Sequence, residues 1–227
     1  NDQIEGIGIS MCAAVDSELG KITIRPYHLP NWTYKEIVKD IKKYFPTTEI
    51  RIKNDAECGA LAEMEYGATA EVNRLYFLII GTGIGGAFVD RTHKPLYVLQ
   101  TEVGYMIIDK NDHTFTGKET SGSFYSFSAG KFIELRYNIK LADIKKDDKL
   151  WDIIASDLSV GIANIISIFN PDEFVLAGGV IYNQEHLLEK INLNLRDCLK
   201  VYKVPKIRIS KLGDNFSLYG ALCLLRY

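Results

Sequence analysis

The sequence predicts an α/β protein in which buried strands alternate with helices, and three observations support this prediction. Leu75 to Ile80 is a nearly continuous apolar run, as expected of a strand that is covered on both faces. The apolar residues between Leu150 and Phe169 recur at helical spacing, which predicts a long amphipathic or buried helix. An extended segment, 50–54, leads directly into an Ala-rich helical segment.

The first third of the chain is expected to run strand, strand, helix, strand, helix. A strand over residues 4–10 is followed by turn residues at 16–20 and by a second extended segment at 21–24. Thr33 is placed to cap a helix that continues to Phe45 and ends before Pro46. The strand 50–54 then delivers Asp55 to the start of a helix over 56–66, for which Gly67 is the stop signal.

The remainder of the chain contains a glycine turn, a long helix and three further elements. The strand at 75–80 is followed directly by the glycine turn 81–86, and a second strand is expected over 84–89. The pattern between residues 92 and 120 is mixed, with an extended stretch at 105–109. Asn170-Pro171 ends the long helix. The pattern then predicts a strand at 174–177, a helix at 185–199, a strand at 206–209 and a final helix at 217–225.

Composition bounds the class of protein. The 227 residues are 47% apolar, enough for a sizeable core. The 27 basic and 29 acidic residues give a formal net charge of -2, and no basic stripe stands out that would indicate nucleic-acid binding. The four cysteines are scattered, which suits a reducing compartment, so a cytoplasmic protein is expected. We expect no apolar run to reach the ~20 residues that span a bilayer, and no signal peptide is visible, so no membrane role is predicted.

Two motifs could carry chemistry, and each also has a structural explanation. Glycines at Gly81, Gly83 and Gly85 let backbone N–H groups approach phosphate oxygens, with Thr82 adding a hydroxyl, but they could also form a tight hairpin. A Rossmann turn is excluded because strand-forming residues follow it. Asp55 could serve as a general base or as an ordinary helix cap. Its neighbour Asn54 could bind a sugar hydroxyl, and this favours the functional interpretation.

Several short motifs are each weak evidence of function when taken alone, but their combination and order along the chain are highly specific. They are Gly6-Ile7-Gly8-Ile9-Ser10 with Val15-Asp16, Leu29-Pro30-Asn31-Trp32, Asn54-Asp55-Ala56 with Ala60-Leu61-Ala62-Glu63, Gly81 to Gly86, Glu102-Val103-Gly104-Tyr105-Met106 and Leu176-Ala177-Gly178-Gly179. This ordered set resembles the ROK family of sugar kinases and sugar-responsive repressors over essentially the whole chain. The resemblance implies an actin-like, ribonuclease-H-like two-lobed ATPase fold.

The resemblance also implies a reaction and its residues. The γ-phosphoryl group of ATP, with Mg²⁺, would pass to a hexose or β-glucoside hydroxyl, with Asp55 as general base and Asn54 and Glu102 on the sugar. Gly81, Thr82, Gly83 and Gly85 would face the nucleotide phosphates, and Gly178 and Gly179 the adenosine. A homodimer is implied as well. The expected lobes are residues 1–72 and 73–213, with 214–227 returning to the small lobe.

The chain departs from the family pattern in four places. Tyr105 replaces the usual His, and the segment from His113 to Ser123 contains no cysteine, so no structural zinc is expected, as in the family's zinc-less, β-glucoside-kinase-like branch. Tyr105 offers an aromatic face and a hydroxyl to a bulkier acceptor. Glu119 is the candidate for a further sugar-binding glutamate. Cys12-Ala13 replaces the usual Pro-Gly after the first strand.

The largest departure is at the start of the chain. The Asp-x-Gly-Gly-Thr phosphate hairpin of ROK kinases has no match in residues 1–227, so the small lobe is expected to be incomplete at its N-terminal side. Two other functions therefore stay open at this point: the sugar-sensing domain of a ROK repressor, and a pseudokinase that keeps only the fold.

Overall fold

The computed structural model describes residues 4–24, 29–115, 121–182 and 184–226. Its larger sheet has five strands in the order β7–β6–β5–β8–β9, namely Tyr97–Thr101, Ile84–Asp90, Arg74–Ile80, Glu173–Ala177 and Lys206–Ile209. β5, β8 and β9 run parallel, while β6 is antiparallel to both of its neighbours. The central parallel strands β5 and β8 are apolar after their first residues, because helices cover both faces of the sheet.

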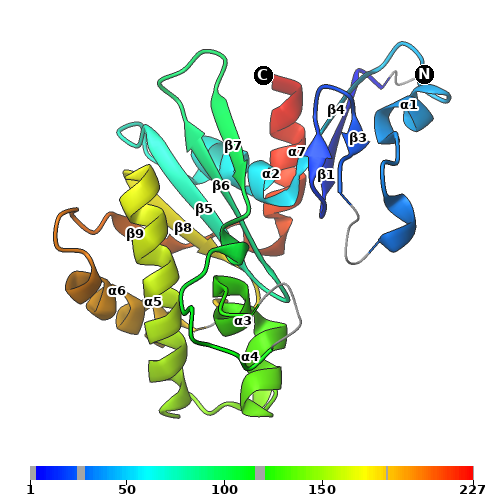
Figure 1. Cartoon of the computed structure of the whole chain (residues 1–227). Helices are drawn as coiled ribbons and strands as arrows, with labels where there is room; N and C mark the ends of the chain where they lie inside the picture. Colours follow the sequence, from blue (N-terminus) through cyan, green and yellow to red (C-terminus); the bar gives the residue numbers. More distant parts are fainter. Residues whose placement is uncertain (1–3, 25–28, 116–120, 183, 227) are drawn as a thin grey trace.

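Successive residues of β5 enter different cores, as the period of a strand requires. Tyr76, Leu78 and Ile80 pack with α5 (Leu150–Phe169), α6 (Glu185–Cys198), α3 (Phe124–Ser128) and α4 (Gly130–Tyr137). Leu75 and Phe77 pack on the opposite side with α2 (Asp55–Ala62) and α7 (Phe216–Cys223). Figure 1 shows α5 and α6 on one face of this sheet and the α2–α7 pair on the other.

The smaller sheet pairs β1 (Gly6–Met11) in parallel with β4 (Glu49–Asn54). A small apolar cluster around Ile22, Ile37 and Ile52 joins β4 to β3 (Lys21–Ile22) and α1 (Ile37–Lys42). β3 pairs with β2 (Val15–Asp16) in a short hairpin. The other side of β1 contacts α7, where a Cβ on Gly8 would lie 1.9 Å from the Ala221 carbonyl oxygen.

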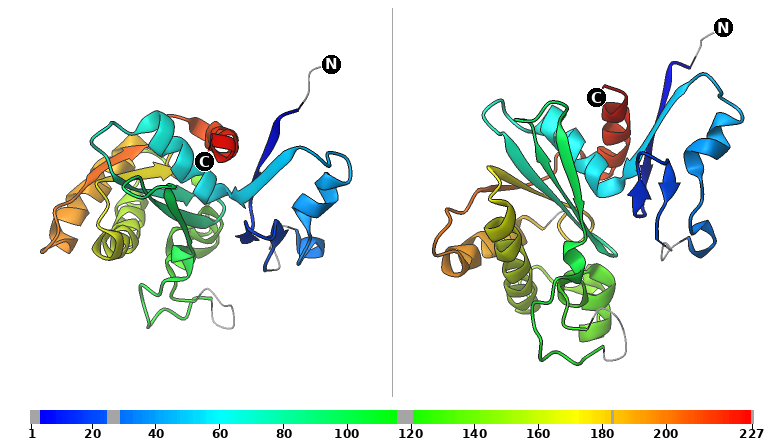
Figure 2. Two further views of the ribbon diagram at one scale, coloured as in Figure 1. Left: turned by 90° about the horizontal axis from the view of Figure 1, so that it is seen from above. Right: turned by 45° about the horizontal axis from the view of Figure 1, so that its top comes forward.

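Helices α2 and α7 lie between the two sheets (Figure 2). They cross closely, since a Cβ on Gly220 would lie 2.0 Å from the Cys58 carbonyl oxygen. Gly59 similarly admits the ring of Phe77 from β5, which a Cβ would meet at 2.1 Å. Only glycine permits both approaches, so α2 is fixed against α7 and against the larger sheet at once.

A buried ion network fixes the end of α2 to the far edge of the sheet. After Ala62 the helix widens into a π-helical turn, Glu63–Gly67. Arg208 on β9 lies 2.6 Å from Glu63 Oε2 and 2.7 Å from Glu173 Oε1 on β8, and Ser210 donates to Glu63 at 2.5 Å. Glu63 and Glu173 are almost fully buried, so Arg208 compensates the charge of both carboxylates, with Lys206 adding a contact to Glu173 at 3.0 Å.

The sequence predicted most strands and the long helices correctly. α5, β9 and β8 lie where expected, and the final helix continues through the short turn Leu224–Arg226. Thr33 caps no α-helix, because it follows the 3₁₀ turn Pro30–Trp32 and α1 begins only at Ile37 after Tyr34 adopts a positive φ. The division into lobes at residues 72 and 213 stays a prediction.

The prediction of an extended stretch at 105–109 is confirmed only in part. Tyr105 ends the 3₁₀ turn Val103–Tyr105, Met106 is extended, and Ile107 forms an isolated bridge to Ser123. β7, α3 and α4 were not predicted, because their apolar residues are spaced by packing against neighbours rather than by a regular local period.

Helix α5 is long and apolar enough to cross a membrane by length and composition, which the sequence interpretation overlooked. It is the one such helix within residues 4–24, 29–115, 121–182 and 184–226, and half of its most apolar window is buried. Core helices of globular proteins have the same properties, and α5 contacts α6 and the larger sheet here.

Candidate active site

Asp55 is positioned by the strand pair β1–β4. The parallel register places Met11 opposite Asn54, so the residues that follow the two strands, Cys12 and Asp55, emerge side by side. Asn54, rather than Asp55, caps α2: its Oδ1 accepts from the backbone N–H groups of Ala56 at 2.7 Å and Glu57 at 3.4 Å. The Glu57 carboxylate accepts in return from the Asn54 N–H, which completes a capping box.

This arrangement frees Asp55 from the capping role. Its carboxylate accepts one hydrogen bond from the Ala56 N–H at 2.9 Å and another from the Cys12 thiol. Burial raises the pKa of Asp55 above its ordinary value of 3.8, while these hydrogen bonds oppose the shift. A carboxylate held this way is more basic than an exposed aspartate, which suits a proton acceptor.

The glycine turn closes tightly beyond β5. The Gly81 N–H donates to the Gly83 carbonyl at 2.9 Å, and the Gly81 carbonyl accepts from the Gly130 N–H at 2.8 Å, at the start of α4. A Cβ on Gly81 would meet nothing within 4 Å, so open space faces this backbone. Thr82 is exposed at the apex of the turn.

The glycine pair after β8 lies beside this turn. Gly178 has φ +100, and a Cβ there would lie 2.5 Å from the Ile80 carbonyl oxygen, so the position requires glycine. The neighbouring Gly179 is exposed, and a Cβ on it would meet nothing within 4 Å. The Val180 N–H donates to the Ile80 carbonyl at 3.0 Å and ties this turn to the end of β5. Gly81 and Gly179 therefore both border open space, as a phosphate or nucleotide would require.

The Asp55 end and the glycine end of the site meet at Gly85. A Cβ on Gly85 would lie 3.8 Å from the Cβ of Ala56, the residue after Asp55. Thr101 pairs with Gly86 across β6 and β7, which brings Glu102 beside Gly85. Glu102 is exposed and accepts a hydrogen bond from Gln100 Nε2 at 2.8 Å. The structure thus brings Asp55, the glycine turn and Glu102 together.

Tyr105 is half exposed beside this group, and its ring stacks on Tyr125 with a centroid distance of 6.2 Å. The sequence interpretation missed Tyr125. A Cβ on Gly83 would lie 3.0 Å from its hydroxyl, and one on Gly104 would lie 3.3 Å from its ring, so Tyr125 links the glycine turn to Tyr105. Its place in α3, an unpredicted helix, concealed it. Glu119 lies outside the described residues.

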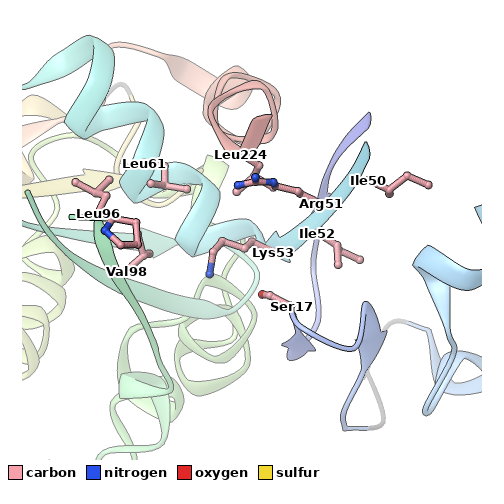
Figure 3. Close-up of a pocket in the computed structure, with 10 residues that line it drawn as sticks. Ser17, Ile50, Arg51, Ile52, Lys53, Leu61, Leu96, Val98 and Leu224 are labelled. Carbon is pink, nitrogen blue, oxygen red and sulfur yellow. The ribbon is translucent and has the colours of Figure 1, made fainter. Parts of the chain in front are cut away.

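One pocket of about 260 Å³ lies elsewhere, between β4, α2 and the β6–β7 connection. Figure 3 shows Leu61, Leu96 and Val98 gathered at one side of it. Its lining is largely aliphatic and includes none of the predicted site residues.

An ion pair between Asp112 and Arg136 anchors the chain at the start of the cysteine-free segment. Arg136 on α4 binds both carboxylate oxygens of Asp112, at 3.2 and 3.0 Å, and lies over the Phe127 ring. This pair and the Thr114 hydrogen bond hold the pKa of Asp112 well below its usual range. Within residues 4–24, 29–115, 121–182 and 184–226, no group of three or more His, Cys, Asp or Glu side chains could hold a metal ion.

Comparisons with known proteins agree with this architecture. Residues 1–227 match the model of the ROK family. A fructokinase of Pediococcus pentosaceus is 26% identical over 97% of this chain and 80% of its own length. A xylose repressor of Caldicellulosiruptor bescii is 23% identical over 98% of this chain and 62% of its own length. The crystal structure of a ROK hexokinase from Thermus thermophilus superposes with a TM-score of 0.80 at 25% identity, covering 96% of this chain and 77% of that one.

The fold and the site therefore define a two-lobed α/β protein of the actin-like, ribonuclease-H-like class. The chain belongs to the ROK family.

Proposed function

We propose that the protein is an ATP-dependent sugar kinase that phosphorylates a hexose or β-glucoside hydroxyl. The observation that carries the proposal is the convergence of Asp55, with its raised pKa, and a glycine turn that borders open space. One group can accept the proton of the attacking hydroxyl, and the other can hold the phosphoryl group being transferred. The similarity to a fructokinase and a hexokinase supports this choice.

In this mechanism the acceptor hydroxyl attacks the γ-phosphorus in line. Its oxygen forms the new P–O bond, its proton moves to the Asp55 carboxylate, and the bond between the γ-phosphorus and the β–γ bridging oxygen breaks to release ADP. Asn54 already uses its side chain to cap α2 and to donate to the Ala13 carbonyl at 3.3 Å, so any sugar contact would use the amide's remaining hydrogen-bonding capacity.

ATP would occupy the open space beside Gly81 and Gly179, where backbone N–H groups could approach phosphate oxygens closely. Mg²⁺ would enter bound to the phosphates and offset their negative charge. Glu102 and Tyr105 border the acceptor side, where the Tyr105 ring can stack on the apolar face of a sugar.

The test is phosphoryl transfer by the full chain and by the variant Asp55→Asn, followed as ADP release with glucose, fructose, N-acetylmannosamine and cellobiose. We expect Asp55→Asn to retain sugar binding by calorimetry and to lose turnover by roughly 10²- to 10⁴-fold, because the carboxamide cannot accept the proton. Wild-type turnover by this variant would contradict the proposed role of Asp55.

The second candidate is a sugar-sensing domain, which the similarity to a xylose repressor favours. In that case the site around Asp55 would bind sugar without chemistry. Sugar binding by the wild-type chain with no sugar-stimulated ADP release, across the same acceptors, would select the sensor over the kinase.

A further inference from the structure

The residues after β1 form a tight turn whose apex is Cys12. The Ala13 N–H donates to the Met11 carbonyl at 2.8 Å, a bond that spans only one intervening residue. The Ala13 carbonyl is in turn held by Asn54 Nδ2 at 3.3 Å. Both anchors are backbone groups next to Cys12, so the direction of its side chain is fixed by the β1–β4 pair rather than by its own packing.

The Cys12 thiol donates a hydrogen bond to the Asp55 carboxylate. The residue as a whole is exposed. Desolvation of the sulfur, the Asp55 charge and this hydrogen bond together raise the pKa of the Cys12 thiol to about 11. The thiol therefore stays protonated at neutral pH and remains a donor.

We propose that Cys12 is a positioning residue for the reaction: its thiol holds the Asp55 carboxylate in the orientation that receives the proton of the acceptor hydroxyl. This inference rests on the proposed function of Asp55. Asp55 has two carboxylate oxygens, and the Ala56 N–H restrains only Oδ1. The Asp55 N–H and the Asn54 side chain also hydrogen-bond to this carboxylate, and both belong to the same end of β4 and α2. The thiol adds a restraint from the opposite strand end, as a positioned catalytic base requires.

The position also restricts what can replace Cys12. A hydroxyl can donate the same bond, whereas a methyl group cannot. We therefore expect Cys12→Ala to lower kcat about threefold to tenfold with little change in the KM for sugar. Loss of a hydrogen bond to the ionised form raises the pKa of Asp55, so the acid limb of the kcat/KM profile should move to higher pH. Cys12→Ser should restore both properties.

A second measurement needs no catalytic activity. Iodoacetamide labelling, quantified by mass spectrometry at pH 8, compares Cys12 with Cys198, the other exposed cysteine. Removing the charge in Asp55→Asn should lower the pKa of the Cys12 thiol and increase its labelling rate by about threefold or more. The rate at Cys198 should not change.

The outcomes separate the two ideas. If the wild type is active and Asp55→Asn is inactive, the kinase proposal stands. If Cys12→Ala then has the same kcat and pH profile as the wild type, the proposed role of Cys12 is overturned. No turnover by the wild type would remove the kinase proposal, and the labelling rates would still decide the contact. Equal labelling of Cys12 in the wild type and in Asp55→Asn would show that the thiol and the carboxylate do not interact.

Discussion

The glycine turn and Asp55 face each other from two sheets of very different construction. β5, which ends in the glycine turn, has Leu75, Tyr76, Phe77 and Leu78 fully buried between helical layers. β1, which helps to position Asp55, has only half-buried residues and pairs with one strand, β4, among the described residues. The phosphate side of the site is thus fixed by a core, and the base side by capping and local hydrogen bonds.

This difference indicates which changes should affect folding and which should affect chemistry. Substitutions behind the five-stranded sheet are expected to change the free energy of unfolding, because they disturb close packing or buried charge. Substitutions at the open edge of the site are expected to change ligand binding alone. Four experiments test this contrast, in decreasing order of their expected effect on stability.

Arg208→Met should have the largest effect. It leaves the carboxylates of Glu63 and Glu173 buried without Arg208, which costs about 3–5 kcal/mol. Urea denaturation should show this as a lower midpoint with an unchanged slope. Lys206→Met is the control, because its side chain is 64% exposed although it also contacts Glu173. Equal destabilisation by the two variants would contradict the expectation that loss of the buried Arg208 charge costs more than loss of the exposed Lys206 charge.

Gly220→Ala should come next, at about 1–3 kcal/mol, because the added methyl group would overlap the Cys58 carbonyl and push α7 from α2. Leu218→Ala on the same helix is the control, since Leu218 is 67% exposed and should change stability by less than about 0.5 kcal/mol. Thermal unfolding of both variants measures the difference. A neutral Gly220→Ala would refute the close crossing.

Asp157 on α5 should make stability depend on pH. Burial raises the pKa of its carboxyl to about 6, above the ordinary value of 3.8. The folded state therefore holds this proton more tightly, and wild-type stability should fall as pH rises from about 4 to 6 and then level off. Asp157→Asn should be more stable than wild type by roughly 2 kcal/mol at pH 7, with the gap closing below pH 4.

Chemical denaturation at several pH values measures this effect, with Asp147→Asn as an exposed control. The variant Asp157→Asn should leave the pH profile of kcat/KM unchanged, because its carboxylate belongs to the helical layer of the larger sheet. A shifted kinetic profile would mean that the two regions are coupled.

Gly179→Ala should have the smallest effect on stability, below about 0.5 kcal/mol, because its Cβ would enter open space. The same methyl group would occupy room proposed for the nucleotide, so the Kd for ATP should rise by about tenfold. Calorimetric titration measures the affinity. Unchanged affinity would remove Gly179 from the nucleotide site without affecting the assignment of Asp55.

Local patterns predicted the strands and helices whose periodicity is strong, such as Leu150–Phe169 and Leu75–Ile80. They did not predict α3 or α4, whose residues are ordered by contacts distant in sequence. The capping role illustrates the same limit: the sequence pattern allowed Asp55 to cap α2, and only the backbone geometry shows that Asn54 is the cap. Tyr125 and the contact between Cys12 and Asp55 join separate segments of the chain, so no local pattern could indicate them.

The double use of Asn54 affects how variants of this protein should be interpreted. One amide ties the end of β4 to the turn after β1 and also starts α2. A growth-based screen would score most replacements at this position as inactive, whether or not the amide ever contacts substrate. The side chain of Tyr105 is half exposed, so we expect altered acceptor preference to be selected more readily at that position.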